Sequence, residues 1–276
     1  MSVAHYENFP VASVLCPAAL RPAVVALYRY ARTADDMADE GTATPDERRA
    51  ELQRYRAALL DALGSPAVLS DNAWPQVFGP LSGVVARFGL PTQPLLDLLD
   101  AFLQDTHNPS YPTRALLLDY CRGSANPVGR MLLHLYGVHD ERSLTESDAI
   151  CTALQLINFW QDFSRDHPKG RCYIPHEDAR DHGLDPAHLA RLRDSPATQA
   201  LVKSLVGWAR ATLKSGHGLP LRLAGRIGWE LRLVVQGGHR ILDKIEAMDH
   251  RSLQQRPRLR PWDVPVLIWH AAKMRA

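Results

Sequence analysis

The sequence has few cysteines, no long apolar run and no block of charge of one sign. Its four cysteines stand far apart, in no CxxC pair and no zinc-like Cys/His spacing, so neither a disulfide framework nor a structural zinc site is expected. No run of about 18 apolar residues and no signal-peptide pattern occurs, which predicts a cytoplasmic protein without a membrane span. The 32 basic and 30 acidic residues are spread along the chain, which argues against a nucleic-acid partner.

The motifs of several enzyme classes are absent as well. The chain contains no HExxH, GxSxG, P-loop or Rossmann glycine motif, and no internal repeat. Its apolar content of 46% suffices for a large core, and apolar residues recur with helical spacing and almost no strand-like alternation. The helical windows span roughly residues 18–40, 46–63, 74–88, 93–106, 112–136, 146–165, 197–217, 223–249 and 261–273. We therefore predict an all-α fold of eight or nine helices in a single domain, residues 1–276.

The first of two acidic clusters ends the window 18–40. Asp35 and Asp39 are four residues apart, so their carboxylates project from one helix face, and Arg32 lies one turn earlier on that face. Like charges at this spacing destabilise a helix unless a cation lies between them. Mg²⁺ suits such a pair, because it takes oxygen ligands from one or two carboxylates together with substrate phosphates. The alternative is a solvated acidic helix end before the turn at Gly41.

The second cluster lies at the end of the window 146–165. Asn158, Asp162 and Asp166 follow one another at intervals of four residues and line one stripe of an otherwise apolar helix. Burying such carboxylates without compensation costs several kcal/mol, so the alternative to a metal site is a set of buried cationic partners. Lys169 and Arg171 follow on a loop, where they can bind phosphate oxygens or simply be solvated. Two such helices facing one another predict a site where Mg²⁺ grips a diphosphate and makes it a better leaving group.

Four motifs, in this order, resemble those of the squalene/phytoene synthases, the trans-isoprenoid head-to-head synthase family. Two of them are the acidic clusters, which match YxxxRxxDDxxD and QxxNxxxDxxxD. A third resembles the family's central tyrosine and small-residue segment, and the fourth matches GRxYxP. The four motifs occupy residues 28–39, 119–125, 155–166 and 170–175. The resemblance covers nearly the whole chain, and four ordered matches are specific.

This resemblance implies an isoprenoid-synthase helical bundle with a central cavity, Mg²⁺ as cofactor, and an isoprenoid diphosphate of the farnesyl or geranylgeranyl type as substrate. It implies that Tyr120 lies near the reacting carbons and that Phe9 belongs to a lid over the phosphates. The metal-binding residues would be Asp35, Asp36, Asp39, Asn158, Asp162 and Asp166. The substrate-binding residues would be Phe9, Tyr28, Arg32, Gln155, Lys169, Arg171, Tyr173 and Arg256.

Three segments resemble the bacterial hydroxysqualene synthase branch of the family, which is associated with hopanoid synthesis. They read HYENFPVAS, ADDMADEG and QGGxRIL. In the last of them, Gly237 and Gly238 stand where an aromatic residue is common near the product cavity, which would leave free space there. In the second acidic motif, Arg165 stands where a glutamate is common. The branch implies conversion of presqualene diphosphate and water to hydroxysqualene without NADPH. The alternatives are a presqualene diphosphate, dehydrosqualene or phytoene synthase, a non-catalytic assembly factor, and a protein whose acidic stripes are buried in an oligomer interface.

A carbocation intermediate would need aromatic faces and one positioned water. Rings at Tyr28, Tyr120, Phe159 and Trp160 can stabilise a desolvated cation by about 0.5–2 kcal/mol each. We propose Asn126 as the catalytic residue that orients the water; the alternative is that it stabilises a helix kink before Pro127.

A lipid substrate suggests peripheral contact with the inner face of the cytoplasmic membrane. The basic residues from Arg251 to Arg260 suit anionic headgroups, although four arginines in a loop of ten residues are also typical of a solvated surface. Functional coupling to a presqualene diphosphate synthase is also expected from the branch resemblance.

Overall fold

The computed structural model describes residues 15–64 and 73–275, and all regular structure in these residues is helical. The α-helices are α1 (Arg21–Asp39), α2 (Pro45–Gly64), α3 (Pro75–Phe88), α4 (Gln93–Asp105), α5 (Arg114–Ser124), α6 (Asn126–Leu135), α7 (Glu141–Asp166), α8 (His176–Asp181), α9 (Pro196–Ser215), α10 (Leu219–Arg222), α11 (Gly225–Ala247) and α12 (Val264–Lys273). Short 3₁₀ segments are η2 (His167–Lys169), η3 (Pro186–Arg191) and η4 (Pro261–Asp263). None of the described helices is both long and apolar enough to cross a membrane. The prediction of an all-α fold is confirmed.

One predicted helix is in fact two. The periodicity predicts a single helix over 112–136, whereas the chain breaks between α5 and α6 at Ala125, whose φ of −121° and ψ of −47° lie outside the helical range. Pro127 explains the break, because proline lacks an N–H and its ring collides with the carbonyl four positions earlier. Proline is tolerated in the first turn, so a new helix begins at Asn126. The short helices α8 and α10 were not predicted.

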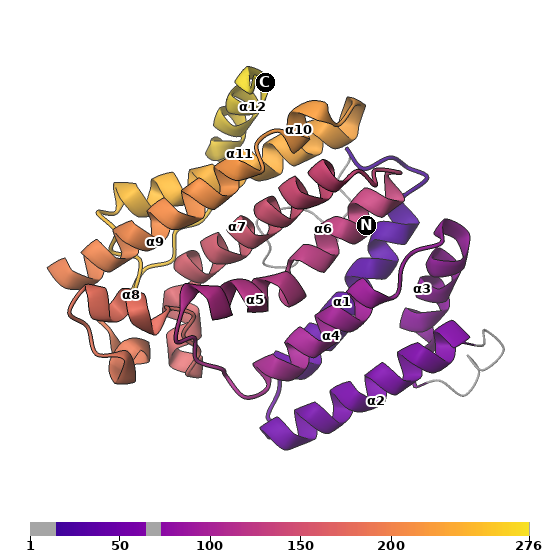
Figure 1. Ribbon diagram of the computed structural model, residues 1–276, viewed down its shortest axis with the longest axis horizontal. Coiled ribbons are helices and arrows are strands. Elements are labelled where there is room, and N and C mark those ends of the chain that lie inside the picture. The colour runs from indigo at the N-terminus through magenta and orange to yellow at the C-terminus, as the bar shows by residue number, and fades with distance from the viewer. Residues whose placement is uncertain (1–14, 65–72, 276) are drawn as a thin grey trace.

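The helices bury two hydrophobic cores. α1 to α4 enclose the first, in which Tyr30 stacks on Tyr55 with ring centroids 5.7 Å apart and donates its hydroxyl to the Leu95 carbonyl at 2.7 Å. α7 runs through the second core beside α9 and α11, where Trp160 is fully buried against Trp208. Figure 1 shows α7 in the middle, with α2 to α4 on one side and α9 and α11 on the other. Helices α5 and α6 join the cores, since each packs on both α4 and α7.

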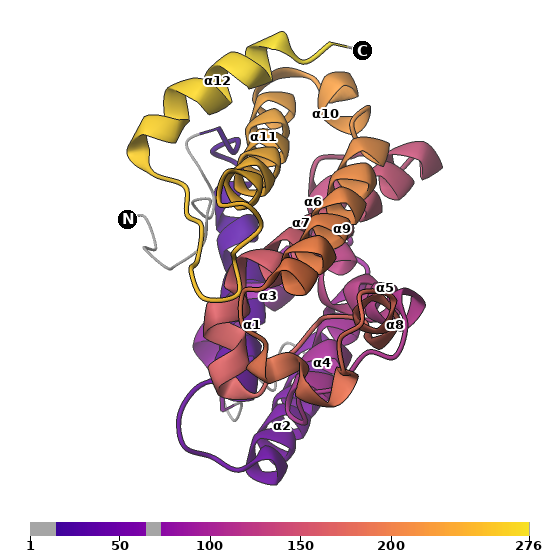
Figure 2. The ribbon, with the colours of Figure 1, turned by 90° about the vertical axis from the view of Figure 1, so that its left-hand side faces the viewer.

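The carboxyl ends of three helices converge where the cores meet. α1 ends at Asp39, α4 at Asp105 and α7 at Asp166. Figure 2 views the molecule from the side on which α7 ends. A helix carboxyl end carries partial negative charge, and here each helix adds an acidic residue to it. This corner of the bundle therefore requires positive charge.

Candidate active site

The last turns of α1 hold the first acidic cluster. Arg32 donates through Nη1 to Asp35 Oδ2 at 2.9 Å and pairs through Nη2 with Asp36 Oδ1 at 2.5 Å. Tyr28 lies one turn earlier and is half-buried. The arginine predicted to contact diphosphate is thus placed among predicted metal ligands. Phe9, predicted to belong to a lid, lies outside the described residues.

The last turns of α7 hold the second cluster. Asn158 is exposed, whereas Asp162, Asp166 and Gln155 are half-buried. Arg256, on the loop between α11 and α12, donates both Nε and Nη2 to the Asp162 carboxylate, the latter at 3.2 Å. Arg256, which the resemblance implies as a substrate-binding residue, therefore lies against the second cluster.

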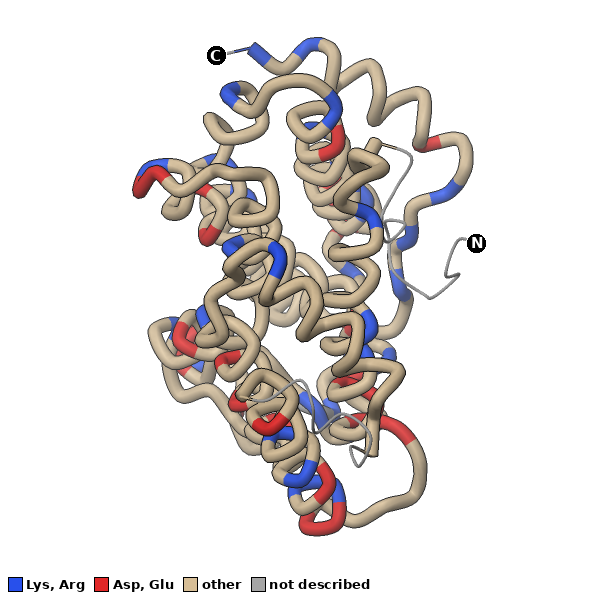
Figure 3. Tube along the Cα trace, turned by 90° about the vertical axis from the view of Figure 1, so that its right-hand side faces the viewer, with Lys and Arg blue, Asp and Glu red and all other residues tan. Residues whose placement is uncertain are grey.

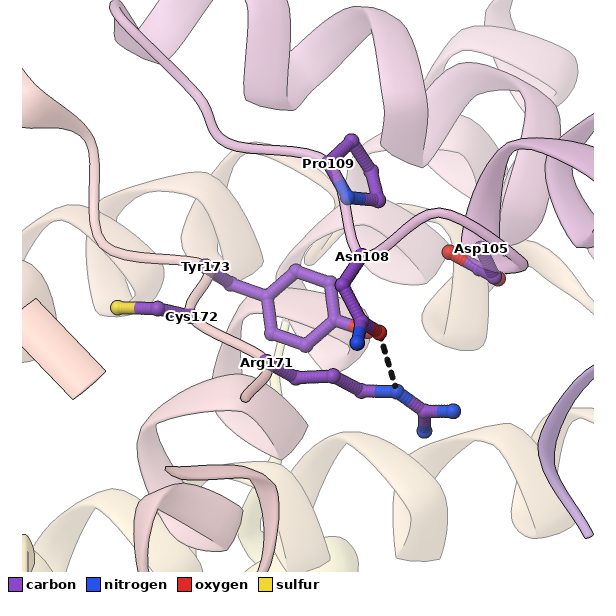
Figure 4. Close-up of a pocket in the computed structure, with 6 residues that line it drawn as sticks. All are labelled: Asp105, Asn108, Pro109, Arg171, Cys172 and Tyr173. Atoms are coloured by element: carbon purple, nitrogen blue, oxygen red, sulfur yellow. Dashed lines mark hydrogen bonds between the residues drawn. The ribbon is translucent and has the colours of Figure 1, made fainter. Parts of the chain in front are cut away.

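Arg171 joins the two clusters. Gly170, with φ of 75°, takes the left-handed conformation that turns the chain out of η2. Arg171 then donates both terminal nitrogens to Asp39, Nη1 at 2.6 Å, and donates Nε to Asn108 Oδ1 at 3.2 Å (Figure 4). Lys169 is exposed, and its carbonyl accepts from Asn108 Nδ2 at 3.3 Å. The guanidinium that follows α7 thus pairs with the last acid of α1.

Asp105 belongs to the same site, although it is absent from the predicted set. Its Oδ2 accepts the Tyr120 hydroxyl at 2.9 Å, and its Oδ1 is buried without a hydrogen-bond partner among the described residues. Figure 4 shows the pocket that it lines together with Asn108, Pro109, Arg171, Cys172 and Tyr173. A sequence signal existed, because Asp105 continues with helical spacing the stripe of Leu98 and Ala101, both buried.

Burial and mutual repulsion raise the pKa of three of these carboxyls. Burial raises the pKa of Asp35 to about 6, and the charge of Asp39 contributes in the same direction. Burial raises the pKa of Asp105 to about 7, and Asp39 and Asp35 add to the shift. The pKa of Asp166 rises to about 7 through burial and the charge of Asp162. Because carboxylates of α1 act on those of α4 and α7, the three helix ends form one electrostatic unit.

The carboxylates of this site are ligands of the chemical type that Mg²⁺ prefers. Carboxylate oxygens are its preferred ligands, and a divalent cation would relieve the repulsion that raises the pKa values and give Asp105 Oδ1 a partner. Within residues 15–64 and 73–275, however, no three carboxylate, imidazole or thiol groups are grouped so that they could hold a metal ion. Arg171 and Arg256 pair instead with Asp39 and Asp162. These two guanidiniums are therefore the groups that metal binding would displace or share.

Aromatic rings border the acidic site. Tyr173 stacks on Phe159 with centroids 3.8 Å apart and an interplanar angle of 9°. The Tyr173 centroid also lies 6.0 Å from that of Tyr120 and 5.9 Å from that of Tyr111. Trp160, expected to face a cation, is instead fully buried in the second core. The aromatic border is thus mainly tyrosine, and Tyr111 is a member that the motifs did not indicate.

Two other predicted positions have packing roles. Asn126 is buried at the start of α6, and its Oδ1 accepts a hydrogen bond from Thr152 Oγ1 of α7 at 2.9 Å. This contact matches the alternative role of stabilising the helix break, and orientation of water stays a prediction. At Gly238, an added Cβ would lie 3.1 Å from Leu154 and 3.2 Å from Leu213. The expectation of free space at this glycine is wrong, because close packing of α7, α9 and α11 fills it.

Comparison with known proteins agrees with the fold and the motifs. The solved structure of squalene synthase HpnC from Alicyclobacillus acidocaldarius superposes with a TM-score of 0.79 and 34% identity over 90% of each chain. Hydroxysqualene synthase from Zymomonas mobilis is 34% identical over 238 residues, which are 83% of this chain and 75% of the relative.

A relative that is matched over more of the chain has the same name. Hydroxysqualene synthase from Sinorhizobium fredii is 31% identical over 262 residues, 94% of this chain and 85% of that protein. The family model for squalene/phytoene synthase matches residues 3–263. From the two acidic clusters, the helical fold and this match together, the chain belongs to the squalene/phytoene synthase family.

Proposed function

We propose that residues 1–276 form one catalytic domain that converts presqualene diphosphate and water to hydroxysqualene and diphosphate. The observation that carries this proposal is that Arg171, which follows the acidic end of α7 and lowers the pKa of Asp166, pairs with Asp39 at the acidic end of α1, beside an aromatic border. The names of the two relatives support the choice within the family. In the reaction, the ester C–O bond breaks and its electron pair leaves with diphosphate. The cyclopropylcarbinyl cation rearranges, water oxygen bonds to carbon, and that water loses a proton.

The diphosphate would be bound at the converging helix ends. The residues that would hold Mg²⁺ are Asp35, Asp36, Asp39, Asn158, Asp162 and Asp166, to which we add Asp105. Bound Mg²⁺ supplies charge neutralisation that makes diphosphate a better leaving group. Arg171 and Arg256 are forked donors suited to phosphate oxygens as well as carboxylates, so each can transfer from its aspartate to the substrate. Tyr28, Arg32, Gln155 and Lys169 would complete the polar contacts.

The hydrocarbon would extend into the predicted central cavity, away from these charges. Tyr120 and Tyr173 would face the cation, where a ring is worth about 0.5–2 kcal/mol. Tyr120 donates its hydroxyl to Asp105 at 2.9 Å, a hydrogen bond that holds the ring in place. Asn126 would orient the attacking water through its amide.

The runner-up is a synthase that condenses two allylic diphosphates to presqualene diphosphate, dehydrosqualene or phytoene. It needs the same acidic clusters, so the site geometry suits both. A non-catalytic assembly factor is the alternative from another class, and the retention of both clusters speaks against it. For the cellular setting, we propose the cytoplasm with peripheral contact at the membrane, and coupling to a presqualene diphosphate synthase that supplies the substrate.

The test is incubation of the full chain with presqualene diphosphate and Mg²⁺, without NADPH, in ordinary and in heavy-oxygen water. We expect a triterpene alcohol whose oxygen comes from solvent, identified by mass spectrometry. Consumption of farnesyl diphosphate with no reaction of presqualene diphosphate would overturn the proposed reaction and favour the condensing synthases. Absence of turnover with either substrate, in protein that binds diphosphate, would favour the assembly factor.

A further inference from the structure

The most exposed large apolar side chains of the described residues gather at the carboxyl end of the chain. Trp262 is 61% exposed, Trp269 59%, and Val264 and Ile268 are each 50% exposed. They lie on η4 and α12 (Figure 2), within eight consecutive residues. Single exposed apolar residues are ordinary, whereas a contiguous group with two tryptophans marks a contact surface.

α12 has two apolar faces, and among the described residues only one of them packs against the rest of the protein. Leu267 and Ala271 are buried where α12 packs on α11. Val264 and Ile268 are one helical turn apart, and Trp269 continues the same exposed side. The exposed face therefore adds nothing to the described core, and its apolar character requires another explanation.

A polar anchor fixes the start of α12 without using that face. Asp263 is fully buried and accepts from Arg240 Nε at 2.8 Å, from Lys244 Nζ at 2.9 Å and from the Arg260 backbone N–H at 2.7 Å. The two cations come from α11, so the first turn of α12 is attached to that helix. The exposed face of α12 is thus held in a defined orientation.

The charge around this face is strongly positive. Residues 251–275 contain six basic residues and one acidic residue, the buried Asp263, whereas the rest of the chain has 26 basic and 29 acidic residues. Arg260 lies over the Trp262 ring at 5.0 Å, and Lys273 over the Trp269 ring at 4.1 Å. Figure 3 shows basic positions along the segment that leads into α12. An apolar face with tryptophans and a basic rim is complementary to the headgroup region of an anionic bilayer.

We propose that η4 and α12 form a binding surface for anionic lipid bilayers, with Trp262, Val264, Ile268 and Trp269 inserted at the headgroup level. Arg258, Arg260, Lys273 and Arg275 would contact lipid phosphates around them. A second copy of the chain is a poorer occupant, because a two-fold contact sets the same surface against itself and opposes basic rims. This inference sharpens the peripheral membrane contact proposed above and is independent of the reaction.

The surface is also joined to the candidate active site by a short segment. Arg256, which pairs with Asp162, stands six residues before Trp262, and the Pro257 carbonyl accepts Gln161 Nε2 at 2.8 Å. A bilayer bound at α12 would therefore lie next to the segment that contacts the second acidic cluster.

The test is sedimentation of the full chain with vesicles of phosphatidylcholine alone or mixed with phosphatidylglycerol, without substrate. Ile268→Glu is compared with Leu60→Glu, because Leu60 is 49% exposed and lies on α2, at the opposite end of the molecule. We expect binding to the mixed vesicles only, about tenfold weaker for Ile268→Glu and unchanged for Leu60→Glu. Circular dichroism would verify that both variants are folded.

A second measurement keeps the outcome independent of one variant. Lipids brominated near the headgroup should quench tryptophan fluorescence, and the double variant Trp262→Phe and Trp269→Phe should remove most of that quenching while binding persists. Absence of binding to phosphatidylglycerol vesicles, or equal binding by Ile268→Glu and wild type, would overturn the proposal. A dimer that Ile268→Glu converts to a monomer, without vesicle binding, would assign the face to self-association instead. Either failure leaves the proposed reaction standing.

Discussion

The two acidic clusters meet at one site, yet each obtains its balancing charge differently. In α1, Arg32 stands three residues before Asp35 and pairs with it at 2.9 Å, so the helix supplies its own cation. In α7, Arg256 reaches Asp162 from a position 94 residues away. A pair within one helix can form as soon as the helix forms, whereas a remote pair requires the packed bundle. The charge balance of the second cluster therefore depends on the position of the loop that carries Arg256, and ligand binding there can be coupled to movement of that loop.

Arg171 combines features of the local and the remote ion pairs. It pairs with Asp39 of the first cluster across 132 residues, although it follows the helix that carries the second. Its guanidinium also opposes the rise in pKa that burial causes at Asp35, Asp105 and Asp166. Loss of Arg171 should therefore affect both clusters, and loss of Arg256 mainly one.

The largest expected effect is that of neutralising one carboxylate in each cluster. Asp35→Asn and Asp162→Asn should each lower kcat about a thousandfold, because each removes a charge that would hold Mg²⁺ without changing side-chain volume. The measurement is the initial rate of diphosphate release. The midpoint of thermal unfolding should differ between the two variants. In Asp35→Asn, Arg32 keeps its ion pair with Asp36, whereas in Asp162→Asn, Arg256 loses its carboxylate partner. Only Asp162→Asn should therefore be less stable than the wild type. Normal rates in both variants would contradict the assignment of the metal site.

Arginine substitutions compare the two remote cations directly. Arg171→Gln should lower kcat/KM about a hundredfold and Arg256→Gln about tenfold, since only Arg171 bears on all three helix ends. Arg171→Lys should recover part of the loss, because it keeps the charge but not the forked geometry. Arg54→Gln on α2, where the side chain is 73% exposed, is the control. If Arg256→Gln proves the more damaging, Arg171 is chiefly a structural link.

Much of the fold was predictable from helical periodicity, because apolar stripes determine which faces are buried. The all-α architecture is confirmed, and the windows over α1, α4 and α7 end within a few residues of the helices. The break before Asn126 was missed because apolar residues continue across it, so that the hydrophobic pattern outweighed the signal of Pro127. Helices as short as α8 and α10 contain too few turns for a period to be visible.

The site residues that were predictable from the sequence are those that share one face of a single helix. Asp35 with Asp39 and Asp162 with Asp166 are visible as i, i+4 pairs. Asp105 was missed because no second acidic residue stands three or four positions from it, and because its partner, the Tyr120 hydroxyl, comes from α5. The pairing of Arg171 with Asp39 depends on how α1 and α7 pack, and the spacing of residues along the chain does not predict that packing.

Repulsion between the carboxylates of the two clusters should make the free energy of unfolding of the metal-free protein depend on pH. Burial raises the pKa of Asp35 to about 6 and of Asp105 and Asp166 to about 7, so the folded state holds protons that the unfolded state releases. Stability is then greatest below about pH 4 for these groups and is lost as pH rises to about 7.

Urea unfolding across that range, with Mg²⁺ chelated, measures this slope. Asp105→Asn should flatten it, because its amide does not titrate and Asp105 is the most buried of the three carboxyls. Saturating Mg²⁺ should reverse the slope above about pH 6, since metal ligation requires deprotonated carboxylates. A metal-free stability that rises steadily from pH 4 to 7 would show that the carboxylates are already balanced by the arginines.

The smallest expected effect is at the rim of the second cluster. Lys169 is exposed, and its charge opposes the burial and the Asp162 repulsion that raise the pKa of Asp166. Lys169→Gln should therefore raise KM about threefold and leave kcat unchanged, and the difference from wild type should disappear at high salt, because exposed charges are screened. Lys214→Gln, an exposed lysine on α9, is the matched control. A loss as large as that of Arg256→Gln, persisting in salt, would mean that Lys169 contacts the diphosphate directly. The second cluster would then use a cation close to it in sequence, as the first cluster uses Arg32, in addition to the remote Arg256.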